Sequence, residues 1–166
     1  MPQTLDMGGL IKKLAMIEEE GVAFYASLAR HTTNEKIRKL AGMMTRAEKI
    51  HQIAFLRLSA KIEARRGAVK PADKLSADFR QYILALIDHR IFLSPEQASV
   101  TAGNLTNEHE AVDMAIGFEK ENILLLRECR EIAGIEAKRL IDKFIEQEKR
   151  HIIALQKARV ILSQPV

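Results

Sequence analysis

The sequence predicts an all-α protein, in which four long helices form an antiparallel bundle with a long connection between the second and the third. Three observations lead to this fold class. The 166 residues are 47% apolar, enough for the core of one domain spanning the chain, and only 5% are aromatic. Ala, Leu, Ile, Glu, Lys and Arg dominate, and these residues favour helices over strands. Apolar residues also recur three and four positions apart over four long stretches.

The first two long helices are expected at residues 5–30 and 35–65. A short polar joint, HTTNEK, separates them, and its Thr33 or Asn34 can cap the second helix. Because the joint is short, the two helices should form an antiparallel hairpin.

The segment after the second helix breaks the long periodic pattern. Gly67 and Pro71 are expected to end that helix. LSADFRQYILALIDHRIFL (75–93) then predicts one helix of medium length, and SPEQASV (94–100) predicts a short capped turn with Pro95 in its first turn. The following TAGNLTN predicts a loop. This segment must carry the chain across the bundle.

The third and fourth long helices are expected at residues 108–133 and 136–163, separated at Gly134. They should form a second hairpin. LAMIEEEGVAFY (14–25) aligns without gaps on AIGFEKENILLL (115–126), and the second and fourth long helices align in the same way. The chain therefore has the pattern of a duplicated helix hairpin.

Two short stretches repeat almost exactly one hundred residues apart, AEKIHQIAF and QEKRHIIAL. Each carries Glu-x-x-His, and residues three apart share one face of a helix, so Glu48 points with His51 and Glu148 with His151. Both pairs fall within apolar stripes. These stripes comprise Ala41, Met44, Phe55, Leu58 and Ile62 on one helix and Ile141, Phe144, Leu155, Ala158 and Leu162 on the other.

The first and third long helices each place one carboxylate in their own apolar stripe, Glu18 and Glu119, whereas Glu19, Glu20 and Glu121 lie off these lines. Counted from the short joints, each carboxylate lies level with the Glu-x-x-His pair of its hairpin, about 21 to 24 Å along the helices. We therefore expect six side chains in one layer at the middle of the bundle.

Four ionised carboxylates in an apolar core need compensating positive charge, because burying an unpaired charge costs several kcal/mol or more. No Lys or Arg lies in the stripes at this level. Two divalent metal ions would supply four positive charges, and two neutral imidazoles would complete the set of ligands. Carboxylate and imidazole ligands with open positions suit iron or manganese better than structural zinc.

Other interpretations use the same residues differently. A single Glu-x-x-His is more often a surface pair than a metal site. The protein could also be a helical adaptor that binds no metal. His31, His89 and His109 lack a Glu three residues before them, so they are expected in loops or on the surface. Met43 and Met44 are expected to fill the core and not to bind copper.

Charge and cysteine content bound the cell compartment and the partners. The net charge is +4, but Lys and Arg are scattered among acidic residues, and the basic stretch at 61–70 falls where a helix should end. A nucleic-acid site is therefore not expected. The one cysteine, Cys129, suits a reducing compartment, and neither a signal peptide nor a membrane span is expected. The predicted location is the cytoplasm.

Four motifs resemble the rubrerythrin family of the ferritin-like superfamily: EEEGVAFY, AEKIH, AIGFEKEN and EQEKRH. The resemblance implies a ferritin-like four-helix bundle and a centre of two iron ions, for which manganese or zinc could substitute. It implies that Glu48 and Glu148 bridge the metals and that Tyr25 binds a ligand carboxylate. The implied iron ligands are Glu18, Glu48, His51, Glu119, Glu148 and His151, which would also be the catalytic residues.

The resemblance also implies a function, with two departures. Rubrerythrins reduce peroxide, and this chain would reduce peroxide or dioxygen; the alternative is iron binding with ferroxidase-type chemistry. Asn122, which would lie beside the ligands, stands where rubrerythrins carry a further ligand Glu, so the iron movement of their peroxidase cycle is not implied. One cysteine cannot build their rubredoxin domain. Electrons should therefore come from an external donor protein or from a small reductant, and a homodimer is expected.

Overall fold

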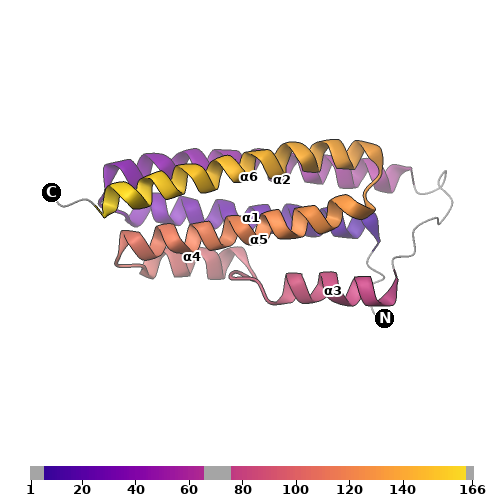
Figure 1. Cartoon of the computed structure of the whole chain (residues 1–166), viewed down its shortest axis with the longest axis horizontal. Coiled ribbons are helices and arrows are strands. Elements are labelled where there is room, and N and C mark those ends of the chain that lie inside the picture. The colour runs from indigo at the N-terminus through magenta and orange to yellow at the C-terminus, as the bar shows by residue number, and fades with distance from the viewer. Residues whose placement is uncertain (1–5, 66–75, 164–166) are drawn as a thin grey trace.

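Six helices and no strand make up the part of the chain that the computed structural model describes, residues 6–65 and 76–163 (Figure 1). In order along the chain they are α1 (Met7–His31), α2 (Glu35–Ala64), α3 (Ala77–Asp88), α4 (Pro95–Asn104), α5 (Glu108–Ile132) and α6 (Ile135–Leu162). The all-α prediction is confirmed. None of these helices combines the length and the apolar character that a membrane crossing requires.

The four long helices form the predicted bundle from two hairpins. α1 packs along α2 in one hairpin, and α5 packs along α6 in the other. Between the hairpins, α2 contacts α6 and α1 contacts α5 (Figure 1). The two shorter helices of the crossover lie on the outside of the bundle, α4 against α1 and α3 beside α5. The core between the long helices is built from Leu, Ile, Ala and five fully buried Phe and Tyr rings, Phe24, Tyr25, Phe55, Phe118 and Phe144.

Short polar side chains fix where the helices begin. Asn34 accepts hydrogen bonds from the backbone N–H groups of Lys36 and Ile37, so the expected cap of the second helix is confirmed. Ser94 caps α4 with Pro95 next to it, also as expected. The expected start at Leu5 and the expected helix-ending residues Gly67 and Pro71 lie outside the described residues.

The crossover differs from the prediction between residues 89 and 93. The helix expected to reach residue 93 ends at Asp88. Beyond it the chain turns inward, so that Phe92 is fully buried against Phe24 and Phe118, with ring centroids 5.1 and 5.5 Å apart. The chain leaves the helical path after Asp88, and the burial of the Phe92 ring stabilises this irregular segment.

The predicted loop at residues 101–107 is wrong in its first half, because α4 continues to Asn104. Ala98 and Ala102 are buried against α1, and Ser27 of α1 donates a hydrogen bond of 2.7 Å to the Ser99 carbonyl. A Cβ on Gly103 would lie 3.3 Å from the His31 ring. Glycine, which suggested a loop, here permits close helix packing.

The apolar stripes are buried much as their spacing predicts, with one exception. Met44 is buried, but Met43 has 60% of its surface exposed. The expectation that both methionines fill the core is therefore wrong for Met43. Its position on α2, one residue before Met44, turns it away from the bundle axis.

Candidate metal centre

The six predicted side chains come together in one buried layer of the bundle. They are Glu18 from α1, Glu48 and His51 from α2, Glu119 from α5, and Glu148 and His151 from α6. Glu48, His51, Glu119 and Glu148 are 0% exposed, whereas the His151 side chain is 13% exposed. The layer forms because each residue occupies a core position of its helix, and the two hairpins bring the four helices level.

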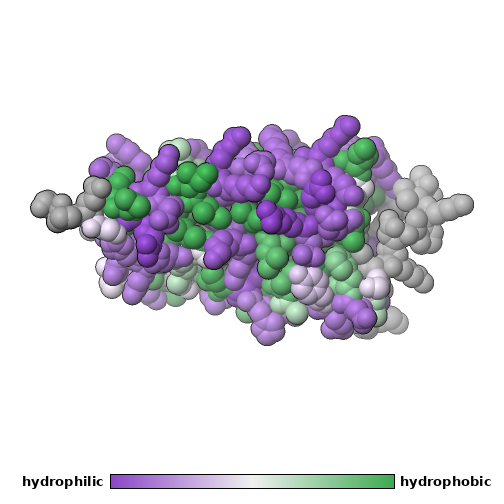
Figure 2. Space-filling view, viewed as in Figure 1, coloured by the Kyte–Doolittle hydropathy of each residue, from purple (hydrophilic) through white to green (hydrophobic). Residues whose placement is uncertain are grey.

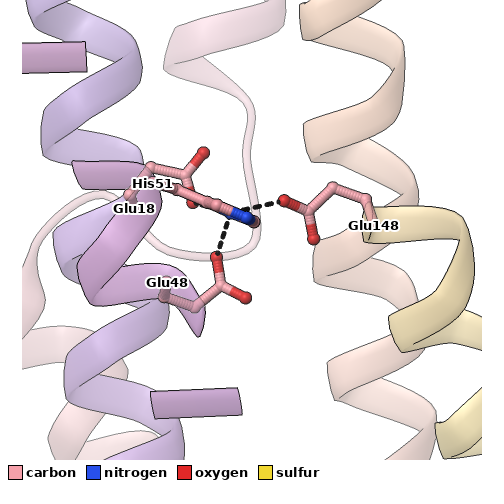
Figure 3. A group of neighbouring side chains, drawn as sticks. All are labelled: Glu18, Glu48, His51 and Glu148. Atoms are coloured by element: carbon pink, nitrogen blue, oxygen red, sulfur yellow. Dashed lines mark ion pairs between the residues drawn. The ribbon is translucent and has the colours of Figure 1, made fainter. Parts of the chain in front are cut away.

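One half of the layer is centred on His51 (Figure 3). Its Nδ1 atom lies 2.8 Å from Glu148 Oε1, 3.4 Å from Glu48 Oε2 and 3.5 Å from Glu18 Oε2. Figure 3 shows Glu148 reaching across from α6 while the other three side chains come from the α1–α2 hairpin. Their ligand atoms all lie within 4.8 Å of one another, close enough to surround one metal ion.

The other half repeats this arrangement around His151. Its Nδ1 atom lies 2.7 Å from Glu148 Oε2, 3.2 Å from Glu48 Oε1 and 3.5 Å from Glu119 Oε1. These four residues form a second group that could hold one ion.

Glu48 and Glu148 belong to both halves. Each directs one carboxylate oxygen toward His51 and the other toward His151. This is the arrangement in which a carboxylate can bridge two metal ions. Glu18 and Glu119 each belong to one half only.

Many of the polar atoms of this layer lack hydrogen bonds. Eight buried atoms have no hydrogen-bond partner among the described residues: Glu18 Oε2, Glu119 Oε2, both oxygens of Glu48 and of Glu148, and Nδ1 of both histidines. Native proteins satisfy nearly all such atoms. Carboxylate oxygens and imidazole nitrogens that converge in this way suit metal cations, so the residues present fit a dinuclear metal site.

Burial and mutual repulsion shift the pKa values of the carboxyl groups in the layer. Burial raises the pKa of Glu18 well above its usual value and that of Glu119 to about 8, and the Glu48 and Glu148 charges add to the respective shifts. Burial would also raise the pKa of Glu148, but its contacts with both histidines lower it to about 2.

The two imidazoles respond in the opposite way. Burial alone would lower the pKa of His151, but the contacts with Glu119, Glu148 and Glu48 outweigh it and raise the pKa to about 12. The pKa of His51 is raised for the same reason, by Glu148, Glu18 and Glu48. Protons on the imidazoles therefore supply the positive charge of the layer when no metal does so.

Tyr25 is completely buried, and its hydroxyl donates a hydrogen bond to Glu119 Oε1. Burial and the negative charge of Glu119 raise the pKa of this phenol, so it remains a donor. The contact expected from the family resemblance is therefore present, and it crosses from one hairpin to the other. The matching position of the second hairpin is Leu126, so Glu18 has no equivalent donor from that position.

Close packing holds the layer in place. The His51 ring lies on Phe144 with centroids 4.2 Å apart, and its Nε2–H donates to Gln147 Oε1 at 3.1 Å. A Cβ on Gly21 would lie 2.9 Å from Phe118 Cε1 and 3.1 Å from Glu48 Cγ. Gly21 thus makes the space that Glu48 occupies. Neither Gln147 nor Gly21 has a spacing signal in the sequence.

A buried ion pair outside the set of candidate ligands lies next to the layer, and no spacing in the sequence predicts it. Glu20 is only 5% exposed, and Arg90 of the crossover lies 2.7 Å from its Oε2 and above the Phe118 ring. Burial raises the pKa of Glu20 to about 7 against the opposing effect of Arg90. Glu20 lies off the stripe that contains Glu18, but the inward turn of residues 89–93 covers it.

The other residues singled out in the sequence lie outside the two candidate ligand groups. Asn122 is buried one turn from Glu119, and neither of its amide atoms has a hydrogen-bond partner within the described ranges. His31 and His89 are exposed and His109 is half-buried, and none of the three contributes to the two groups. Cys129 is buried, and burial raises its pKa to about 12.

Comparison with known proteins agrees with this geometry. The family model named Rubrerythrin matches residues 11–159. Among solved structures, the fold is similar to that of a Thermotoga maritima protein described as a ferritin-like diiron-carboxylate protein, with a TM-score of 0.66 and 21% identity over 96% of this chain and 97% of that one. This similarity shows the ferritin-like fold. No curated protein sequence matches the chain.

Proposed function

The chain belongs to the rubrerythrin family, and on that premise we propose that it is a non-haem di-iron oxidoreductase that reduces peroxide or dioxygen. The observation that carries the proposal is the pair of overlapping Glu/His groups whose inward atoms lack hydrogen bonds.

The two overlapping groups of ligands would each hold one ion. Glu18 and His51 would hold one ion, and Glu119 and His151 would hold the other. Glu48 and Glu148 would each bind both ions. Four carboxylates carry four negative charges, which two divalent cations balance. Iron is the metal that the family implies, and manganese or zinc could occupy the same ligands.

When bound, two ferrous ions would supply two electrons at positions open to a small oxidant. Reduction of one hydrogen peroxide to two waters requires two electrons and two protons. The chain's own groups set the conditions: Phe144 and Phe55 exclude water beside His51, and Tyr25 holds Glu119 in position. Without metal, burial raises the pKa of Glu119 to about 8, so near neutral pH this carboxyl would release a proton when an ion binds.

The proposal is tested by anaerobic loading with ferrous ion. We expect two iron ions per chain by elemental analysis, and one peroxide consumed for every two ferrous ions oxidised. A metal content of one or zero, or ferrous protein that peroxide leaves unoxidised, would contradict the proposal. Chelation that leaves the thermal stability unchanged would instead favour a metal-free adaptor.

Asn122 favours one alternative, iron handling with ferroxidase-type chemistry and no peroxide turnover. Its amide occupies the position where rubrerythrins carry an additional carboxylate ligand. Steady-state turnover separates the two functions: a peroxidase consumes peroxide repeatedly while a reductant is present, whereas the alternative consumes oxidant only in proportion to added ferrous ion.

A further inference from the structure

Positive charge is concentrated on one side of the bundle. α2 and α6 together contain fourteen Lys and Arg but seven Asp and Glu, of which Glu48 and Glu148 are buried in the centre. α5 has the opposite balance, with seven acidic residues and three basic ones. Although the net charge of the chain is only +4, the side formed by α2 and α6 is strongly basic.

A groove runs between α2 and α6 on this basic side. It has a volume of about 480 Å³ and is lined by Ala54, Arg57, Leu58, Lys61, Glu136, Arg139, Leu140 and Lys143. Lys61 pairs with Glu136. Arg57, Arg139 and Lys143 are exposed and form no ion pair with any described residue. Three unpaired cations thus surround an apolar floor.

The apolar floor of the groove is formed by Ala54, Leu58 and Leu140. Further along the same helices, beyond the groove lining, Ile50 is 62% exposed and Ile153 55%. Figure 2 shows a different face of the bundle, formed by α5 and α6 with α2 behind α6, where apolar side chains are interspersed with hydrophilic ones. Contact surfaces between proteins commonly combine an apolar centre with a charged rim.

The groove ends one helical turn from the candidate metal centre. Ala54 follows His51 by three residues, and Lys143 precedes Gln147 by four. Gln147 is half-buried and accepts the hydrogen bond of His51. His151, on α6, is the member of the layer with the most exposed side chain. The groove therefore ends one helical turn from His51 and from Gln147, its hydrogen-bond partner.

We propose that the α2–α6 groove is the docking surface for a small acidic protein that carries one electron at a time. The proposal rests on the proposed function. Two successive dockings would deliver two electrons, which with two protons from solvent reduce one hydrogen peroxide to two waters. Opposite charges steer the carrier to the groove and orient it, and the apolar side chains complete a small transient interface.

Two other occupants fit the observations less well. A second copy of this chain docked face to face would place the cations of one groove against those of the other, which opposes association. The homodimer expected from the sequence would therefore use another face. A nucleic acid would contact the cations but not the apolar floor of the groove, and no aromatic side chain among the described residues lines the groove for stacking on bases.

The test uses the iron-loaded, oxidised protein and a reduced plant-type [2Fe–2S] ferredoxin as the acidic carrier. Stopped-flow absorbance measures the second-order rate constant of ferredoxin oxidation between low and high salt. We expect this rate constant to fall steeply as the salt concentration rises, because exposed charges are screened.

A matched pair of charge-reversal variants locates the interaction. Arg139→Glu with Lys143→Glu changes the groove, whereas Lys12→Glu with Arg127→Glu changes exposed residues of α1 and α5 by the same total charge. At low salt we expect the groove variant to lose about tenfold or more in rate constant. The control variant should retain its rate constant within about twofold. Arg139→Gln with Lys143→Gln should give an intermediate loss.

Each result bears on the proposal. Equal losses in the two charge-reversal variants, or a rate constant independent of salt, would overturn it. So would sedimentation showing a dimer that only the groove variant dissociates, or a short DNA duplex binding the groove more tightly than oxidised ferredoxin. Reduction by dithionite separates the two proposals: if dithionite does not reduce the centre, the proposed function fails, and calorimetric titration with oxidised ferredoxin still decides the docking.

Discussion

Glu48→Gln and Glu18→Gln should have unequal effects on metal binding, because Glu48 belongs to both groups and Glu18 to one. Both substitutions replace a fully buried carboxylate by a neutral group of nearly the same shape. Glu18→Gln leaves the group of Glu119 and His151 intact, so one ion should still bind. Glu48→Gln removes a ligand from both groups, so fewer than one ion should bind at concentrations that saturate the unmodified protein.

The size of the effect follows from binding linkage. An ion present at about one hundred times its dissociation constant stabilises the folded state by about 2.7 kcal/mol, so two independent ions contribute about 5 kcal/mol. For a chain of this size, each kcal/mol raises Tm by roughly 2–4 °C. Metal should then raise the Tm of the unmodified protein by about 10–20 °C and that of Glu18→Gln by about 5–10 °C. The rise in Glu48→Gln should be smaller still.

The assay compares each variant with itself. Differential scanning calorimetry with chelator and with manganese gives the Tm rise, so any change in the stability of the metal-free protein cancels. Calorimetric titration under the same conditions gives the number of ions bound. Equal stoichiometry in the two variants, or a smaller Tm rise in Glu18→Gln than in Glu48→Gln, would refute the shared-carboxylate geometry.

Three further predictions follow from the surroundings of the centre. Tyr25→Phe removes the hydrogen bond to Glu119, so one of the two ions should bind about 10–100-fold more weakly by calorimetric titration while the other is unaffected. The metal-free protein should lose stability as pH rises from 6 to 8, because the folded state retains a proton on Glu119, whose pKa is about 8, that the unfolded chain has released. Metal displaces such protons, so the metal-dependent Tm rise should grow over the same interval; scanning fluorimetry at pH 6, 7 and 8 with and without metal checks both. Gly21→Ala should destabilise by about 1–3 kcal/mol in urea unfolding, because its Cβ would overlap Phe118. Gly42→Ala, where the nearest atom lies 4.0 Å away, should stabilise the helix by roughly 0.5–1 kcal/mol, and a loss there as large as at Gly21 would contradict this explanation.

The sequence predicted the long helices and the buried layer because both follow from spacing within a helix. Glu-x-x-His places two ligand types on one face, and the apolar stripe shows that this face is buried. Short joints then align the hairpins, so positions distant in sequence reach the same level. Glu48 and His151, for example, could be placed in one layer before their distance was known.

Contacts from the crossover could not be predicted in this way. Arg90 reaches Glu20 only because the chain leaves its helix at Asp88, and no periodicity records that turn. Gly103 was misleading because a glycine suggests a loop by its local preference, whereas here it permits contact with α1. Met43 is exposed where a hydrophobic residue was expected inside. For Arg90 and Gly103 the deciding interaction comes from another element of the fold, whereas the exposure of Met43 follows from its place on α2 beside the buried Met44.

The hydrogen bond from Tyr25 has a consequence for how such a centre can evolve. Two separate identical hairpins assembling around the same ions would carry every substitution twice, and both ions would change together. In a single chain that contains both hairpins, a phenol can be kept at position 25 while its counterpart at 126 becomes leucine. Covalent linkage thus frees the two halves to diverge, and mutation can adjust the environment of one ion without altering that of its neighbour.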